Sequence, residues 1–156
     1  MTDPLEIEGT ENQRVDFTKM QVSEFEKYMD EKFPGRMYNV YRQREWMIEN
    51  GSGWNGLVYW LVSNIERYMK KEHPEEDWEV HQIKEKFGQL RFYTSALPDY
   101  CDQLVSTAES ISECLCETCG TFAGGTTLHS KGWIYNECPT CKEDTDKKLE
   151  EIKRGQ

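Results

Sequence analysis

Two cysteine pairs with the same internal spacing constrain this chain more than any other feature. Cys116 and Cys119 form one Cys-x-x-Cys pair, Cys138 and Cys141 form a second, and 18 residues separate the two. Such a pair aims two thiolates at one point about 2.3 Å from a zinc ion, and two pairs complete a tetrahedron. Gly120 follows the first pair, where a tight turn needs a residue that tolerates positive φ. The sequence therefore predicts one structural Zn²⁺ bound by four cysteines.

Two further residues are alternative ligands for this site. Cys114 lies two positions before Cys116, within reach of replacing it, and His129 lies between the two pairs. The simpler interpretation of Cys114 and of Cys101 is a buried helix thiol, because free cysteine is often buried. For His129 the simpler interpretation is an exposed loop residue. A sphere of four cysteines has no open position for water or substrate, so we expect the metal to stabilise the fold without catalysing a reaction.

The sequence offers little support for an enzyme. It contains no glycine-rich phosphate loop and no nucleophile elbow. His73-Pro74-Glu75 matches the His-x-Glu half of the zinc deaminase signature, whose other half is Pro-Cys-x-x-Cys. Leu115 and Glu137 precede the two cysteine pairs, so neither pair has that proline. We therefore expect a protein without catalytic residues.

Composition bounds the compartment and the partners. The 156 residues have a net charge of −10 without a basic tail or stripe, which argues against an electrostatic grip on nucleic acid. The 19 aromatic residues indicate a folded domain. No apolar run approaches the length of a membrane span, and the acidic N-terminus does not have the apolar segment of a signal peptide. We expect a cytoplasmic protein whose thiols stay reduced, which favours metal binding over disulfides.

Hydrophobic periodicity predicts an α+β fold, with helices packed around a β-hairpin and a C-terminal four-cysteine zinc ribbon. The expected organisation is a mobile acidic leader at 1–15, a core at 16–113, the zinc ribbon at 114–141 and a charged, helical tail at 142–156. The core is expected to contain helices over 18–33, 36–48, 54–72 and 99–115, and a hairpin over 78–94 with strands 78–83 and 89–94 joined by a loop at 85–88.

The hairpin has two opposed interpretations. Lys84, Lys86 and Arg91 lie among Phe87, Phe92 and Tyr93, the mixture of cations and stacking aromatics found on RNA-binding sheets. Only three cations gather here against a surplus of acids elsewhere, and aromatics beside apolar helix faces more often form a core. We favour the core interpretation and expect nucleic acid not to be the partner.

These motifs together resemble a family of small uncharacterised proteins encoded by bacteriophages and prophages. The matching segments are Gly53-Trp54, the run 82–93 with its Lys-Phe-Gly-x-Leu-Arg-Phe-Tyr sequence, Ala108-Glu109, the Cys116-x-x-Cys119-Gly120 knuckle, Gly132-Trp133 and Cys138-x-x-Cys141. The resemblance covers roughly residues 50–142, and Cys114 is an addition to the pattern. It implies a phage origin and work in the cytoplasm of a bacterial host, without implying a reaction.

The function expected from these features is non-catalytic binding of a host protein, to inhibit or redirect it in counter-defence or host takeover. Glu117, Lys131 and Glu137 are the only charged residues in 114–141, and few charges with several aromatics are typical of an interface centre. Phe122 and Tyr135 are the first candidates for partner contacts, and Trp133 is a third that could instead pack on the metal site. The alternatives are a nucleic-acid-associated zinc-ribbon protein and an acidic DNA mimic that blocks a DNA-binding host enzyme.

Overall fold

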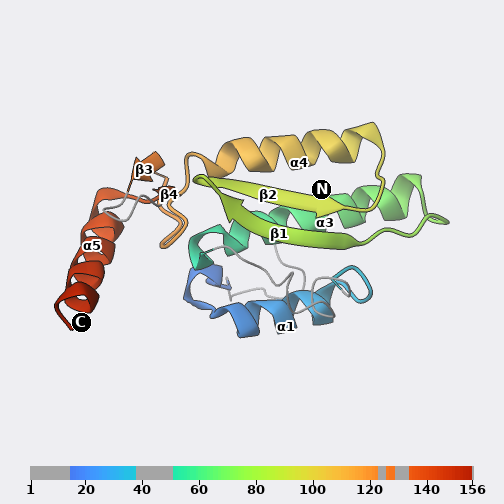
Figure 1. Ribbon diagram of the computed structural model, residues 1–156. Helices are drawn as coiled ribbons and strands as arrows, with labels where there is room; N and C mark the ends of the chain where they lie inside the picture. The colour runs from blue at the N-terminus through green and yellow to red at the C-terminus, as the bar shows by residue number, and fades with distance from the viewer. Residues whose placement is uncertain (1–14, 38–50, 123–125, 129–133, 156) are drawn as a thin grey trace.

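The computed structural model describes residues 15–37, 51–122, 126–128 and 134–155, and it confirms an α+β fold. The described chain contains four α-helices, one β-hairpin and one short ribbon (Figure 1). The helices are α1 (Val22–Lys32), α3 (Asn55–Glu72), α4 (Asp99–Ser112) and α5 (Pro139–Arg154). The strands are β1 (Val80–Lys86), β2 (Gln89–Thr94), β3 (Thr126–Leu128) and β4 (Ile134–Asn136), and 3₁₀ turns lie at Phe17–Lys19 (η1) and Ser52–Trp54 (η3).

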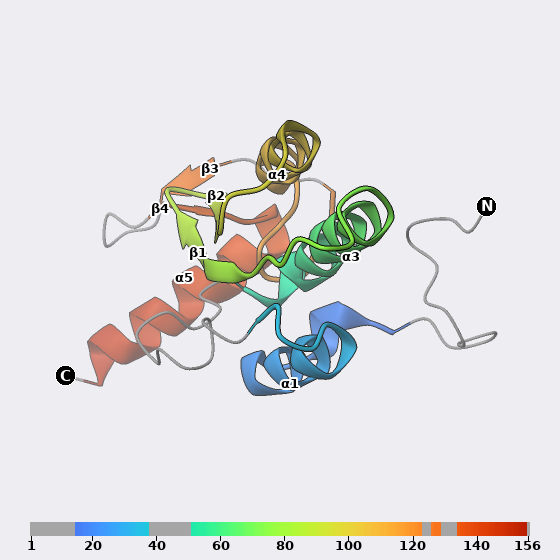
Figure 2. The ribbon, with the colours of Figure 1, turned by 90° about the vertical axis from the view of Figure 1, so that its right-hand side faces the viewer.

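Helix α3 lies at the centre of the core. Its apolar stripe is wide, and its buried hydrophobic side chains are Leu57, Val58, Tyr59, Leu61, Val62, Ile65 and Met69. The helix ends at Glu72, just before His73-Pro74, because proline disfavours helix in the residue that precedes it. In Figures 1 and 2, α1 lies on one side of α3 and α4 on the other, beside the hairpin. The sequence prediction of a central, mostly buried helix is confirmed.

The hairpin buries one of its two faces. β1 and β2 are antiparallel, and the pair Ile83 and Phe92 faces the core together with Leu90. The outer edge of β2 is covered by α4, since Ser112 Oγ accepts a hydrogen bond from Leu90 N at 2.9 Å and Glu109 accepts one from Phe92 N at 3.1 Å. These two bonds satisfy backbone groups that would otherwise be open to pairing with another chain.

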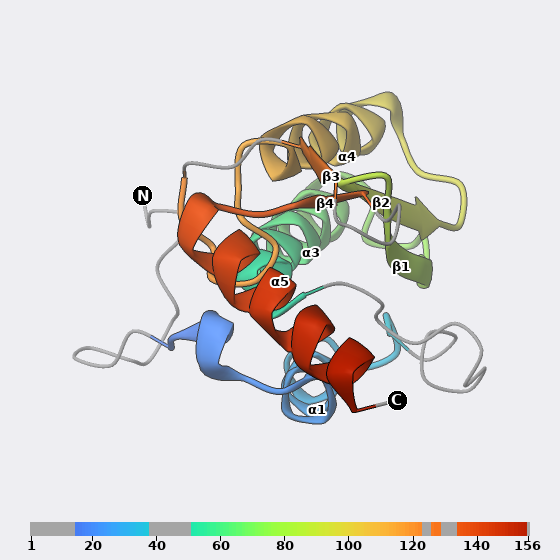
Figure 3. The same cartoon turned by 60° about the vertical axis from the view of Figure 1, so that its left-hand side comes forward.

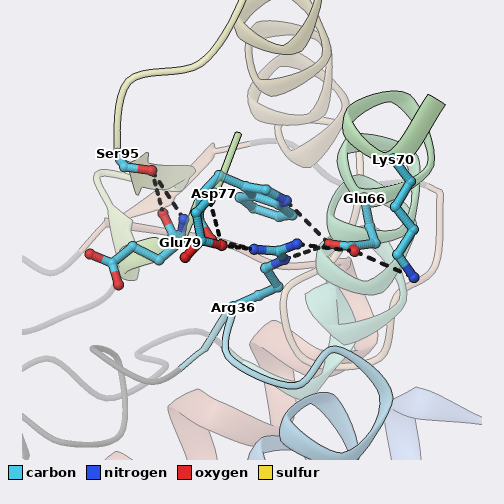
Figure 4. A network of polar contacts seen from close by, with 7 residues as sticks. Arg36, Glu66, Lys70, Asp77, Glu79 and Ser95 are labelled. Atoms are coloured by element: carbon cyan, nitrogen blue, oxygen red, sulfur yellow. Dashed lines mark hydrogen bonds and ion pairs between the residues drawn. The ribbon is translucent and has the colours of Figure 1, made fainter. Parts of the chain in front are cut away.

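A polar network joins the end of α1 to α3 and to the start of the hairpin (Figure 4). Arg36 donates from Nε to Glu66 at 2.7 Å, from Nη2 to the same carboxylate at 3.3 Å and from Nη1 to Trp78 O at 3.0 Å, and it also pairs with Asp77. The guanidinium lies over the Trp78 ring, 5.2 Å from the centroid, and the indole donates to Glu66 at 3.1 Å. Arg36 and Glu66 are mostly buried, whereas their other ionic partners, Asp77 and Lys70, are exposed, so each of the two is the main buried counter-charge of the other.

The structure differs from the sequence prediction at several boundaries. The helix expected over 18–33 is split into η1 and α1, and the helix expected over 99–115 ends at Ser112. The prediction of a four-residue hairpin loop at 85–88 is wrong. Both strands continue to a two-residue turn, Phe87-Gly88, in which both residues have positive φ. The tail is helical, but its helix begins at Pro139. The expected leader (1–15, apart from its last residue) and most of the helix expected over 36–48 lie outside the described residues.

Candidate metal centre

The four predicted cysteines meet at one point. Their Sγ atoms all lie within 4.8 Å of one another, and Cys119 Sγ is 3.7 Å from Cys138 Sγ. A tetrahedron with metal–sulfur bonds of about 2.3 Å requires sulfurs about 3.8 Å apart, so the spacing fits a single four-coordinate ion. All four thiols are free, and so are Cys101 and Cys114. These four cysteines could therefore hold a metal ion with their sulfurs alone.

The first pair forms a tight knuckle. Gly120 has φ +78° and donates its N–H to Cys116 O at 2.8 Å, while Cys119 N points at Cys116 Sγ at 3.5 Å. An N–H directed at sulfur stabilises the thiolate form that a metal requires. Thr121 closes the turn, because its carbonyl accepts from Cys116 N at 2.9 Å. The sequence prediction that Gly120 takes a positive φ is confirmed.

The second pair is built differently from the turn that the spacing suggested. Cys138 is the N-cap of α5, Pro139 is the first residue of that helix, and Cys141 lies in its first turn. Proline is suited to this position because its fixed φ is close to the helical value. An N–H at the first helical position would have no acceptor within the helix, so its absence from proline costs nothing there. The positive end of the helix dipole therefore faces the sulfur cluster, where it stabilises thiolate charge.

The knuckle is joined to the core through two glycines near the start of α3. Gly53 N donates to Glu117 O at 2.8 Å, and a Cβ on Gly53 would lie 2.2 Å from Cys116 O. A Cβ on Gly51 would lie 2.1 Å from Glu117 O. The buried Trp54 indole donates to Leu115 O at 2.9 Å, immediately before the first ligand. The close approaches at Gly51 and Gly53 require glycine, because the atoms that a Cβ would meet are backbone atoms that cannot rotate away.

A chain of buried polar groups connects the metal centre to the hairpin. Glu117 accepts from Asn136 N at 2.9 Å and its own N–H donates to Asn136 O at 2.8 Å. Asn136 Nδ2 donates to Ser112 O at 2.9 Å, and the Ser112 hydroxyl oxygen accepts from Leu90 N. Glu117, Asn136 and Ser112 are all buried. The metal centre, β4, the end of α4 and β2 are thus joined by continuous hydrogen bonds. No local pattern in the sequence indicates this connection.

The acidities of the site follow from burial and from one hydroxyl. The Thr121 hydroxyl, 3.0 Å from Cys119 Sγ, lowers the pKa of Cys119 to about 6, whereas burial raises the pKa of Cys116 and of Cys141. Cys119 is also the cysteine of the four that lies at the surface. Burial raises the pKa of Glu117 to about 7, with the hydrogen bond from Asn136 opposing and the charges of Glu85 and Glu137 adding to the rise.

The other candidate residues have separate positions. Cys114 is exposed, lies beyond the end of α4 and is outside the four-sulfur cluster, so its interpretation as a buried helix thiol is wrong. Cys101 is buried in the core as expected, and desolvation raises the pKa of its thiol to about 11. His129 and Trp133 lie outside the described residues. Phe122, just beyond the knuckle, is 73% exposed, and Tyr135 on β4 is partly buried.

The lobe that contains the metal centre sits at one end of the molecule. Figures 1 and 3 show β3, β4 and α5 gathered beyond the tip of the hairpin, with α5 extending from the cysteines towards the C-terminus. Among the described helices, none combines the length and apolar character that crossing a membrane requires. No family model matches the chain, and neither a curated protein nor a solved structure matches it.

Proposed function

We propose that this chain is a non-catalytic protein that holds one structural Zn²⁺ and binds a protein partner. The observation that supports the metal is the cluster of four cysteine sulfurs, whose spacing fits a tetrahedral site. Among the described residues, this cluster contains no histidine or carboxylate. Tetrahedral sulfur sites suit zinc or iron, and zinc is the common structural choice for paired Cys-x-x-Cys motifs. Four thiolates fill the coordination sphere, so a metal here would not bind substrate.

The proposed role of the zinc is to fold the C-terminal lobe and hold it on the core. β3 and β4 are three residues each, and α5 has no buried residue, so the described part of this lobe has little apolar core of its own. Metal-binding free energy then becomes folding free energy for the lobe. On chelation we expect faster amide exchange over 116–155, while α3 and the hairpin keep their protection because they share a separate core.

The proposed partner surface surrounds the knuckle. Phe122 is largely exposed, whereas Glu117 and Glu137, the two acids of 114–141, are buried. Within the described part of 114–141, no charged side chain is exposed beside this exposed aromatic, which is the composition of an interface centre. Tyr135 contributes as a partly buried neighbour in β4.

The resemblance to phage-encoded proteins makes a bacterial host protein the proposed partner. The chain's net charge of −10 would speed its encounter with a protein that has a basic rim around the contact. Inhibition or redirection of that protein, in counter-defence or host takeover, is the proposed outcome.

The experiment is affinity capture from bacterial lysate followed by measurement of the captured protein's affinity for variants. Phe122→Ala and Tyr135→Ala should each weaken binding at least about 30-fold, which corresponds to the roughly 2 kcal/mol or more of an interface hot spot. Tyr100→Ala is the matched control, because Tyr100 is an exposed aromatic on α4. Wild-type affinity in both folded variants would place the interface elsewhere, and displacement of the partner by excess DNA would favour acidic mimicry over this surface.

A further inference from the structure

The two faces of the hairpin differ sharply in chemistry. The pleat sends Ile83, Leu90 and Phe92 into the core. The cross-strand pairs on the opposite face are Gln82 with Tyr93, Lys84 with Arg91, and Lys86 with Gln89. We call these six residues and the turn residue Phe87 the hairpin face. The sequence-based expectation that the aromatics of this segment form a core holds for Phe92 and does not hold for Phe87 or Tyr93, which are exposed.

The hairpin face is cationic on an acidic protein. Lys84, Lys86 and Arg91 share it, and within β1 and β2 no carboxylate does. Glu85, the only acid in either strand, pairs with Leu90 on the opposite face and accepts a hydrogen bond from Gly88 N at 2.7 Å. The net charge of −10 for the whole chain argued against nucleic-acid binding, but the local charge of the hairpin face is positive.

Two aromatic rings lie beside these cations: Tyr93 on this face, and Phe87 in the turn next to Lys86. Phe87 is 67% exposed and Tyr93 is 45% exposed. Lys86 Nζ lies 5.8 Å from the Phe87 ring centroid, and Lys84 Nζ lies 5.9 Å from the Tyr93 centroid. Each ring is therefore exposed to solvent and accompanied by a positive charge.

Phe87 occupies an unfavourable backbone position. Its φ is +54°, in a turn where asparagine or glycine is preferred and where a bulky side chain is a genuine outlier. The ring is not buried, so core packing does not account for its presence at this turn. Strained residues of this kind concentrate at ligand-contacting sites.

We propose that the hairpin face binds single-stranded nucleic acid. Bases would stack on Phe87 and Tyr93, and backbone phosphates would pair with Lys84, Lys86 and Arg91. Four residues of β2 lie between Tyr93 and the turn residue Gly88. The distance along the strand from Gly88 to Tyr93 is therefore roughly 17 Å, which is the span of a few nucleotides. This activity goes beyond the proposed protein binding and uses residues that do not include Phe122 or Tyr135.

An acidic protein segment is the other ligand that three cations could attract, and the aromatics favour nucleic acid over it. Stacking platforms next to cations are the shared feature of proteins that bind single strands, because every base presents a π-face. A carboxylate-rich peptide would pair with the three cations of the hairpin face, but it has no planar groups that would stack on the Phe87 and Tyr93 rings.

The experiment measures binding of a fluorescent thymidine oligonucleotide to the full chain by anisotropy at several salt concentrations. With three phosphate contacts, the slope of log affinity against log salt should be about −2, and Lys84→Gln should make it shallower by about 0.7. Tyr93→Ala should weaken binding roughly 5- to 150-fold without changing the slope, the range for losing one stacked base. Phe87→Asn should weaken it similarly while keeping the turn, because asparagine suits this backbone position.

Matched controls separate this face from the rest of the surface. Lys70→Gln removes an exposed cation on α3, and Phe122→Ala removes the exposed aromatic of the proposed protein interface. Both should bind the oligonucleotide like wild type. Undetectable binding at low salt, or equal affinity in all variants, would overturn the proposal. Tighter binding of a polyglutamate peptide than of the oligonucleotide would also overturn it and assign the face to an acidic protein segment.

Discussion

Replacing Gly53 by alanine should disrupt the contact between the metal knuckle and the core. The added Cβ would lie 2.2 Å from Cys116 O, 2.6 Å from Gly120 N and 2.7 Å from Glu117 C. All three facing atoms are backbone, so no side chain can rotate to make room. The start of α3 must therefore separate from the knuckle, which also breaks the hydrogen bond from Gly53 N to Glu117 O.

The expected cost combines two effects. Forcing an extra carbon into a packed interior costs about 1–3 kcal/mol, and the lost hydrogen bond adds about 0.5–1.5 kcal/mol. We expect Gly53→Ala to lower the free energy of unfolding by about 1.5–4.5 kcal/mol. Because the strain falls on Cys116 and Gly120, the variant should also release its metal to a chelator faster than wild type.

Gly56→Ala is the matched control, three residues further along the chain. A Cβ there would meet only Phe17 Cδ2 at 3.9 Å, an ordinary contact. Alanine is the better helix former, so this change should raise stability by up to about 1 kcal/mol. Urea unfolding followed by tryptophan fluorescence measures both variants. If Gly53→Ala is as stable as wild type, or if both substitutions shift stability equally, the close approach described here does not exist.

The remaining predictions concern the core, the polar network and the hairpin turn, and urea unfolding tests each. Phe92→Ala should cost about 3–5 kcal/mol because the ring is buried, and an unchanged midpoint would mean that the hairpin is not packed on the helices. Arg36→Ala should lower the free energy of unfolding by about 3 kcal/mol, because it leaves the mostly buried Glu66 without its main partner. Lys70→Ala should lower it by under about 0.5 kcal/mol, because Lys70 is exposed. Equal effects of the two substitutions would contradict a stabilising role of the buried pair. Phe87→Asn should raise stability by about 1 kcal/mol by relieving the positive φ, and a loss of stability would refute the strain.

Local patterns in the sequence were sufficient for the elements that depend on local physics. The stripe that includes Leu61 and Ile65 repeats with the helix period, and Pro74 marks the helix end, so α3 could be predicted closely. The spacing of the cysteine pairs similarly predicted which four sulfurs meet, since each pair is a local unit. Pro139 in the first helical position was a helix-start signal, but the Cys-x-x-Cys pattern led to a turn being expected there.

Contacts between distant segments could not be predicted in the same way. Glycines at 51 and 53 indicate a turn by composition, and nothing local indicates that a backbone more than 60 residues away lies against them. The hydrogen bonds that join Asn136 to Ser112 and Glu117 depend on the packed fold alone. The short turn at Phe87 was missed because a phenylalanine with positive φ goes against backbone preference.

Metal content measured by native mass spectrometry, with elemental analysis of the same samples, decides whether the four cysteines bind one zinc ion. The four-cysteine account predicts one zinc per chain in the wild type, loss of that zinc in Cys119→Ser and Cys141→Ser, and full retention in Cys114→Ser, since Cys114 is exposed and outside the cluster. Wild-type zinc in both ligand variants, or loss of zinc only in Cys114→Ser, would contradict it.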